Sequence, residues 1–224
     1  MRWLALVAMI ITILAGNSLA RGLEAHVSDM PAPTTEPTTE RDGNGKWEFS
    51  LSAYTYFVPD DHEYVQPTLT ADRGVLHLEA RYNYEALETG SVFVGFNFSW
   101  GERLALELTP MIGGVFGEVN GIAPGYRLSL NWNRLDFYAE GEFLIDCEDN
   151  SDNYFYVWNE LTYAPTDWIR FGLAAQRTRL YDSDVDIHPG LLLGFSWKQF
   201  EFTGYVFDVG FDDPTFVLGA TVRF

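Results

Sequence analysis

The chain has 224 residues, a formal net charge of −18 and an aromatic content of 16%. So acidic a composition provides no basic surface for nucleic acid, which excludes a nucleic-acid-binding protein. With a single cysteine, Cys147, an intrachain disulfide is excluded as a source of stability.

The N-terminal residues 1–20 have the composition of an export signal. In "MRWLALVAMIITILAGNSLA" one early positive charge, Arg2, precedes an apolar run that closes with the small residues Ser18 and Ala20. This order predicts a secretory signal peptide cleaved after Ala20. Residues 21–45 are rich in Pro, Thr and Glu, so they are predicted to be disordered. Residues 46–224 are predicted to form one domain.

Beyond Gly45 the sequence alternates between apolar and polar residues. In 76–85, Leu76, Leu78, Ala80, Tyr82 and Tyr84 alternate with polar residues, and a period of two is typical of a β-strand. The fold class is therefore all-β, with about twelve strands and ten as the alternative. The predicted strands are 46–57, 63–71 (the weakest, since it contains Pro67), 75–85, 91–99, 103–112, 123–131, 134–145, 154–163, 167–178, 188–197, 199–207 and 215–224. Most have the length of a tilted strand that crosses a bilayer.

The connections between these strands are of two kinds that alternate along the chain. Short turns are predicted at 72–74, 100–102, 132–133, 165–167 and 197–199, and the mostly longer polar loops at 59–63, 87–90, 113–121, 146–153, 180–187 and 208–214. Such alternation predicts a closed antiparallel up-and-down barrel with one compact end and one end that carries the loops. Five tryptophans at the compact end are predicted to form an aromatic girdle at a membrane interface: Trp47, Trp100, Trp132, Trp168 and Trp197.

The last predicted strand, "TFVLGATVRF", places Phe216, Leu218, Ala220, Val222 and Phe224 on one face and ends on an aromatic residue. In this pattern the chain resembles bacterial outer-membrane β-barrel proteins, including porins. The resemblance is at the level of the class and covers 46–224. It implies a transmembrane barrel in the outer membrane of a Gram-negative bacterium, with Phe224 as a signal for the barrel-assembly machinery, and outer-membrane lipid and lipopolysaccharide as surroundings.

Energetics decides which face of each strand points outward. An Arg in the middle of a bilayer costs about 2–4 kcal/mol on the lipid face, so the charged face is predicted to line the lumen. The predicted polar network of the lumen consists of His77, Glu79, Arg81, Glu85, Glu107, Arg127, Glu140, Glu142, Glu160, Arg170, Glu201 and Arg223. Twelve strands leave room for either a narrow wet pore or a plugged lumen.

The loops at the opposite end from the tryptophans are rich in aspartate. The residues of this predicted acidic extracellular rim are Asp60, Asp61, Asp146, Asp149, Asp152, Asp182, Asp184, Asp186, Asp212 and Asp213. Clustered carboxylates raise the local concentration of cations at a pore mouth. They also provide oxygen ligands for loosely bound Ca²⁺ or Mg²⁺. The alternative is a solvated rim that only keeps the loops soluble. No dedicated metal site or other cofactor is predicted.

Two further groups of inward residues have alternative interpretations. His77 and Glu79 share a strand face, so they are either an acid/base or metal-binding pair or part of a hydrogen-bonded network. Because Ser196 and the other inward serines lie outside any nucleophile motif, no catalytic residue is assigned. Trp158, with Tyr154 and Tyr156, either stacks on a flat solute or fills the lumen.

These patterns together predict a small porin-like channel for ions or small solutes, biased to cations by its acidic rim. A structural or adhesive barrel with a plugged lumen is the first alternative, and a lipid-modifying enzyme is the second.

Overall fold

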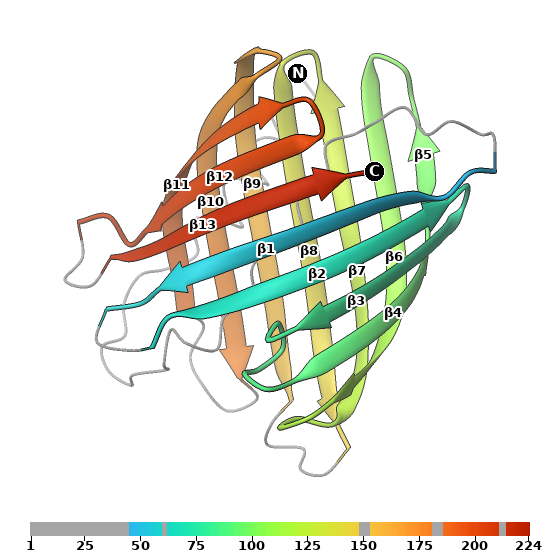
Figure 1. Ribbon diagram of the computed structural model, residues 1–224, viewed down its shortest axis with the longest axis vertical. Helices are drawn as coiled ribbons and strands as arrows, with labels where there is room; N and C mark the ends of the chain where they lie inside the picture. Colours follow the sequence, from blue (N-terminus) through green and yellow to red (C-terminus); the bar gives the residue numbers. More distant parts are fainter. Residues whose placement is uncertain (1–44, 60–61, 148–152, 181–185, 211–213) are drawn as a thin grey trace, which may run out of the picture.

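The structure is a computed structural model that describes residues 45–59, 62–147, 153–180, 186–210 and 214–224. These residues form one antiparallel sheet that closes on itself, because β4 pairs with β6 (Figure 1). The strands are β1 (Glu48–Phe57), β2 (Tyr64–Arg73), β3 (Leu76–Tyr82), β4 (Gly90–Phe96), β5 (Phe98–Trp100), β6 (Leu104–Phe116), β7 (Gly121–Trp132), β8 (Leu135–Asp146), β9 (Tyr154–Thr166), β10 (Ile169–Leu180), β11 (Asp186–Trp197), β12 (Phe200–Phe207) and β13 (Thr215–Arg223). Within the described part of the chain, no helix is long and apolar enough to span a bilayer.

The strands β4 and β5 are two parts of one barrel strand. Both pair with β6, and the interruption between them lies at Asn97. The side chain of Asn97 is buried, donating from Nδ2 to Asp72 and accepting from the hydroxyl of Thr109 (2.6 Å). Its backbone N–H donates to the carbonyl of Val75 (2.8 Å). Counted in this way the barrel has twelve strands, so the predicted fold class and strand number are confirmed, and the alternative of ten is wrong for the described chain.

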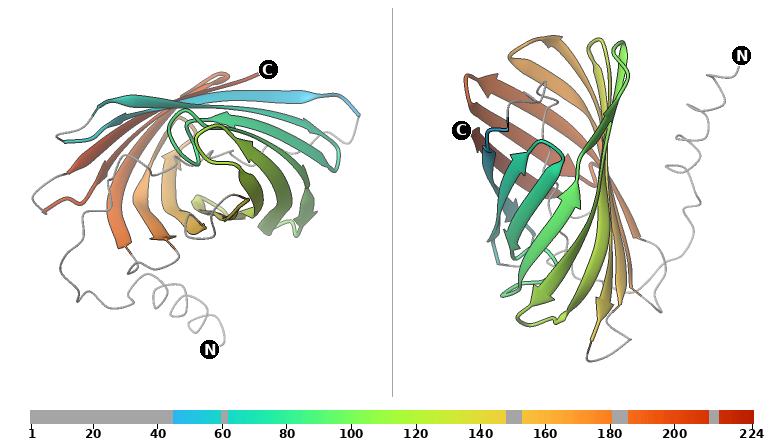
Figure 2. Two further views of the ribbon diagram at one scale, coloured as in Figure 1. Left: turned by 90° about the horizontal axis from the view of Figure 1, so that it is seen from below. Right: turned by 90° about the vertical axis from the view of Figure 1, so that its right-hand side faces the viewer.

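The two ends of the barrel differ as the sequence predicts. Tight turns join β2 to β3, β7 to β8 and β11 to β12, with positive φ at Gly74 (57°), Asn133 (56°) and Lys198 (56°). The first and last strands of the barrel are neighbours, and at this short-turn end Phe49 and Phe224 exchange two backbone hydrogen bonds of 2.9 Å. Figure 2 shows the wall formed by β1, β2 and β13 facing the curved wall that contains β7–β9 across the interior.

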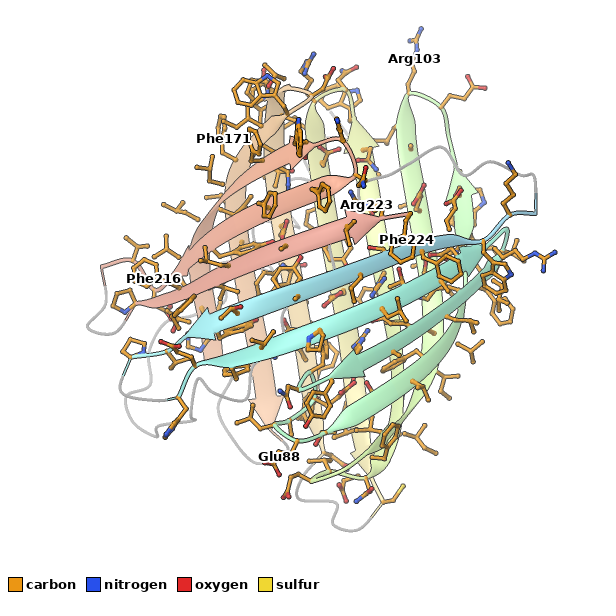
Figure 3. The ribbon with its side chains drawn as sticks, in the orientation of Figure 1. Glu88, Arg103, Phe171, Phe216, Arg223 and Phe224 are labelled. Atoms are coloured by element: carbon orange, nitrogen blue, oxygen red, sulfur yellow. The ribbon has the colours of Figure 1, made fainter. Side chains whose placement is uncertain are left out.

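The faces of the strands are inverted relative to a soluble barrel. In β1, Ser50, Ser52 and Tyr56 are buried whereas Leu51 is exposed, and the pattern repeats around the sheet. Figure 3 shows Phe171 and Phe216 on the outer surface. An outer surface of aliphatic and aromatic side chains around a charged interior is favourable in hydrocarbon, where the closed sheet also satisfies every ladder N–H and C=O. The barrel is therefore transmembrane.

Two local expectations differ from the structure. Alternation predicts that Tyr84 faces lipid, but β3 ends at Tyr82 and Asn83 has a φ of 55°, which breaks the alternation and turns Tyr84 into the lumen at 2% exposure. The predicted Gly-rich loop 113–121 is shortened to residues 117–120, since β6 continues to Phe116 and β7 begins at Gly121. Gly113 lies opposite Phe93, whose ring would be 2.5 Å from a Cβ at this position, so glycine here serves close packing rather than a turn.

Candidate functional site

The middle of the lumen contains a central charge cluster that consists of Glu79, Arg81, Arg127, Glu140 and Glu142, all of them buried. Arg81 on β3 donates from Nη1 to Glu142 Oε2 on β8 (2.7 Å) and also pairs with Glu79 on its own strand. Arg127 on β7 pairs with the same Glu79. These contacts join β3 to β7 and β8 across the interior, and Glu140 Oε2 lies 3.9 Å from Arg127 Nε, so each charge of the cluster has an opposite charge beside it despite its burial.

One histidine and one tyrosine extend this cluster along the lumen, in opposite directions. Toward the short-turn end, His77 lies between Asp72 Oδ1 (3.0 Å) and Glu79 Oε2 (3.1 Å). Toward the loops, Tyr84 donates to Glu140. Because Glu79, one of the two carboxylate partners of His77, is also paired with Arg81 and Arg127, the structure favours the interpretation as a polar network.

The connection between β3 and β4 folds into the loop side of the lumen. The hydroxyl of Tyr154 on β9 donates to the backbone carbonyl of Glu85 in this connection (3.2 Å). Burial raises the pKa of the Glu85 carboxyl above its ordinary value, because the charged form is poorly solvated there. The hydrogen bond from Tyr154 joins the connection to the opposite wall.

Aromatic side chains fill much of the lumen on the loop side. This lumen aromatic cluster consists of Tyr54, Tyr56, Tyr64, Tyr156, Trp158, Tyr205 and Phe207. The Trp158 ring meets those of Tyr205 and Phe207 edge-on, with centroids 5.4 Å and 5.2 Å apart, and Tyr56 stacks on Tyr64 at 4.8 Å. Trp158 and Tyr56 have 0% exposure. The structure therefore supports the space-filling interpretation of Trp158.

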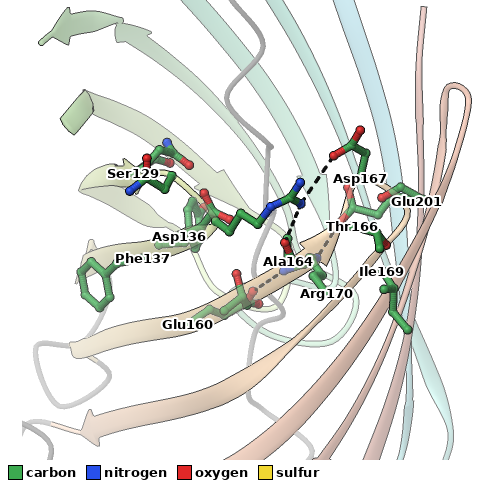
Figure 4. Close-up of a pocket in the computed structure, with 16 residues that line it drawn as sticks. Ser129, Asp136, Phe137, Glu160, Ala164, Thr166, Asp167, Ile169, Arg170 and Glu201 are labelled. Atoms are coloured by element: carbon green, nitrogen blue, oxygen red, sulfur yellow. Dashed lines mark hydrogen bonds and ion pairs between the residues drawn. The ribbon is translucent and has the colours of Figure 1, made fainter. Parts of the chain in front are cut away.

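A polar cavity of about 600 Å³ opens at the short-turn end of the lumen (Figure 4). We call it the inner vestibule. The charged residues that line it are Arg134, Asp136, Glu160, Asp167, Arg170 and Glu201. Arg170 donates to Glu160 Oε2 (3.1 Å) and to the hydroxyl of Thr203 (3.0 Å), and it pairs with Glu201 Oε1 (2.8 Å). The cavity wall is thus held by a network of paired charges.

Glu160 connects the inner vestibule with the lumen aromatic cluster. One of its oxygens, Oε1, accepts hydrogen bonds from Trp158 Nε1 (3.0 Å) and the Tyr205 hydroxyl (2.8 Å), while the other faces Arg170. Movement of Arg170 would therefore disturb the contact that holds Trp158. Ion pairs and aromatic packing form one continuous structure along the lumen.

The structure brings most of the predicted lumen network together. Buried members are His77, Glu79, Arg81, Glu85, Arg127, Glu140, Glu142, Glu160 and Glu201, and half-buried members are Glu107, Arg170 and Arg223. Sequence reasoning missed Tyr138 and Tyr205, although both alternate with charged residues on the inward face of their strands. Tyr138 donates to Glu140 Oε2 (2.5 Å).

Most residues of the predicted acidic rim lie outside the described part of the chain. Asp146 is buried at the end of β8. The residues that lie outside the described part of the chain are Asp60, Asp61, Asp149, Asp152, Asp182, Asp184, Asp212 and Asp213, together with the side chain of Asp186. Asp208, also in a loop, pairs with His188 (2.6 Å). Among the described residues no group of three or more His, Cys, Asp or Glu could hold a metal ion.

The tryptophans and the C-terminal residue lie on the outer surface at the short-turn end. Trp47, Trp100, Trp132, Trp168 and Trp197 are all exposed there. Phe224 is 70% exposed and stacks on Phe49 with ring centroids 5.8 Å apart. Their roles as an interfacial girdle and an assembly signal stay predictions.

The barrel resembles solved structures of porins. Two of them are structures of a KdgM porin, alone and in complex with disordered oligogalacturonate, with TM-scores of 0.58 and 0.59 and identities of 11% and 12%. Each match covers 78% of this chain and 99% of the other. A NanC porin has a TM-score of 0.55 at 10% identity, covering 77% of this chain and 98% of that one. No family model and no curated protein matches the sequence. The fold is therefore that of a porin-like barrel.

Proposed function

We propose that this protein is a porin-like channel of the bacterial outer membrane that passes small polar solutes with a preference for cations. The carrying observation is the inner vestibule, whose lining includes four carboxylates, Asp136, Glu160, Asp167 and Glu201, but only two arginines. A lumen wall with excess negative charge concentrates cations and repels anions. An anionic sugar oligomer, such as the oligogalacturonate in complex with one KdgM porin, is therefore not the expected solute of this chain.

The proposal includes the export of the protein, its assembly and its contacts with the membrane. We expect export by the signal peptide 1–20, recognition of Phe224 by the barrel-assembly machinery, and contact of the apolar outer face with lipid and lipopolysaccharide. The long loops would face the cell exterior, as in other bacterial barrels, and the inner vestibule would open toward the periplasm.

Conductance across a planar bilayer tests the channel directly. The purified barrel, in a KCl gradient at neutral pH, is expected to give small steps and a reversal potential that favours K⁺. High ionic strength should weaken the preference, because salt screens the wall charges. An anion preference at neutral pH would contradict the proposal, and a bilayer with correctly folded barrel but no steps would reject the channel altogether.

A structural barrel with a plugged lumen is the second candidate, favoured by the complete burial of Trp158 and Tyr56. The two candidates differ in how they respond to removal of the lumen aromatic cluster. In a channel, the double change Trp158→Ala and Tyr205→Ala should enlarge conductance steps that the wild type already shows. In a plugged barrel the wild type is silent and only the double variant conducts. The control is a stacked aromatic pair on the outer face, the exposed Trp197 and the half-buried Phe200, changed in the same way to Trp197→Ala and Phe200→Ala.

A further inference from the structure

We propose that the inner vestibule contains a binding site for a hydroxylated organic cation of the size of an amino sugar, with Asp136 as its counter-charge. This inference rests on the proposed channel function and names the class of solute that the channel would select. The volume of about 600 Å³ lies within the range of about 300–1,000 Å³ of small-molecule sites.

The site is built on two rows of side chains that the strand register places next to each other. Asn131 on β7 lies opposite Asp136 on β8, which in turn lies opposite Thr162 on β9. Two residues further into the lumen, Ser129 on β7 lies opposite Tyr138 on β8 in a second pair across the same two strands. All five residues line the cavity. The second row continues to Glu160 on β9, which is paired with Arg170, so the wall presents one carboxylate without an ion pair, Asp136, beside hydroxyl and amide groups.

Asp136 differs from the other carboxylates of the vestibule. Glu160 and Glu201 are both paired with Arg170, and Asp167 lies 3.6 Å from Arg134. Asp136 makes no hydrogen bond or ion pair with the described residues, and Arg170 acts on it only through Coulomb attraction. A half-buried carboxylate without a partner is costly, and an ammonium group placed beside it would offset that cost.

Unpaired polar atoms supply an independent reason to expect a ligand. Nδ2 of Asn131 and the hydroxyl of Thr166 are buried and have no hydrogen-bond partner among the described residues, although both residues line the cavity. Buried polar groups are normally satisfied, so an unpaired donor in a cavity wall marks a place for a solute or water. The hydroxyls of a sugar would satisfy both atoms once the two side chains turn toward the cavity, while Asp136 holds the ammonium.

The vestibule is less suited to an anion, because the two terminal nitrogens of its deeper arginine, Arg170, are already taken by carboxylates and a hydroxyl, and only its buried Nε lacks a partner among the described residues. Arg170 contacts Glu160, Glu201 and Thr203. It also lies flat against Gly194 on the neighbouring strand, where a Cβ would come within 2.7 Å of the Arg170 side chain. The absence of a side chain at Gly194 thus keeps this guanidinium against the wall.

Binding to the intact barrel in lipid nanodiscs tests the proposal. At pH 7, calorimetry should detect binding of glucosamine, weaker binding of glucose, and the weakest binding of gluconate. Asp136→Asn should lower the affinity for glucosamine at least tenfold. The control Glu102→Gln changes an exposed carboxylate in the β5–β6 connection, at the same end of the barrel but outside the cavity lining, and should alter the affinity less than twofold. Equal glucosamine affinities of wild type and Asp136→Asn, or a preference for gluconate, would overturn the proposal.

A second variant leaves Asp136 in place. Gly194→Ala should displace Arg170 into the cavity and therefore weaken glucosamine binding while strengthening that of gluconate. Unchanged affinities for both solutes would refute the role of Arg170.

Conductance of the same samples separates this proposal from the channel itself. A barrel that conducts K⁺ but does not bind glucosamine refutes the site and leaves the channel standing. A barrel that binds glucosamine through Asp136 without conducting refutes the channel and retains the site.

Discussion

Single residues in this lumen differ greatly in how much the fold depends on them. Arg81 contacts Glu79 and Glu142, and its guanidinium also lies over the rings of Tyr84 (4.0 Å) and Phe93 (4.3 Å). By contrast, Arg134 is half exposed and its partner Asp167 is fully exposed. A buried arginine shared by several carboxylates cannot be replaced by water, whereas an exposed pair can.

We therefore predict that Arg81→Gln destabilises the barrel by about 3–5 kcal/mol, because it leaves buried carboxylates without their positive charge. Urea unfolding in lipid vesicles, followed by tryptophan fluorescence, measures this loss. Arg134→Gln is the matched control and should leave the unfolding midpoint unchanged. An Arg81→Gln barrel as stable as the wild type would show that water or protonation of a carboxylate compensates for the missing guanidinium.

Between neighbouring strands, glycines opposite aromatic residues determine how closely the walls pack. Tyr54 on β1 lies opposite Gly219 on β13, and Phe207 on β12 lies opposite Gly190 on β11. A Cβ at either glycine would come within 2.5 Å of the opposing ring. These rings lie flat over the glycines and belong to the lumen aromatic cluster, so the packing of the strands and the filling of the lumen depend on the same residues.

Gly219→Ala is accordingly predicted to cost about 1–3 kcal/mol, because the Tyr54 ring must move within a packed interior. Gly114→Ala is the control: Gly114 is on the lipid side, and nothing lies within 4 Å of a Cβ there. The same urea titration compares the two variants. The double variant Gly219→Ala with Tyr54→Ala should show less than the summed loss, and strict additivity would argue against the overlap as the cause.

For the whole molecule, the sequence determines the barrel better than it determines the lumen. Period-two alternation and turn spacing are enough to predict twelve strands, because both are local properties, and the cost of a charge in hydrocarbon then decides which face of each strand points outward. Pairing across the lumen, such as Arg81 with Glu142, joins residues 61 positions apart and depends on which strands face each other in the closed barrel, which no local pattern encodes. The prediction for Tyr84 is wrong for a local reason, since alternation fails once Asn83 adopts a positive φ.

Orientation in the membrane is the remaining property of the whole barrel, and the single cysteine provides a probe for it. Cys147 is exposed at the loop end, next to the last residue of β8. If the loops face the cell exterior, a membrane-impermeant maleimide should label Cys147 on intact cells. The control places the only cysteine at the other end, as Cys147→Ser with Asn133→Cys in the β7–β8 turn, where labelling should require lysis. Loop length predicts the outward end in such barrels. Labelling of intact cells only at position 133 would therefore show that the orientation is the reverse, with the inner vestibule at the cell surface.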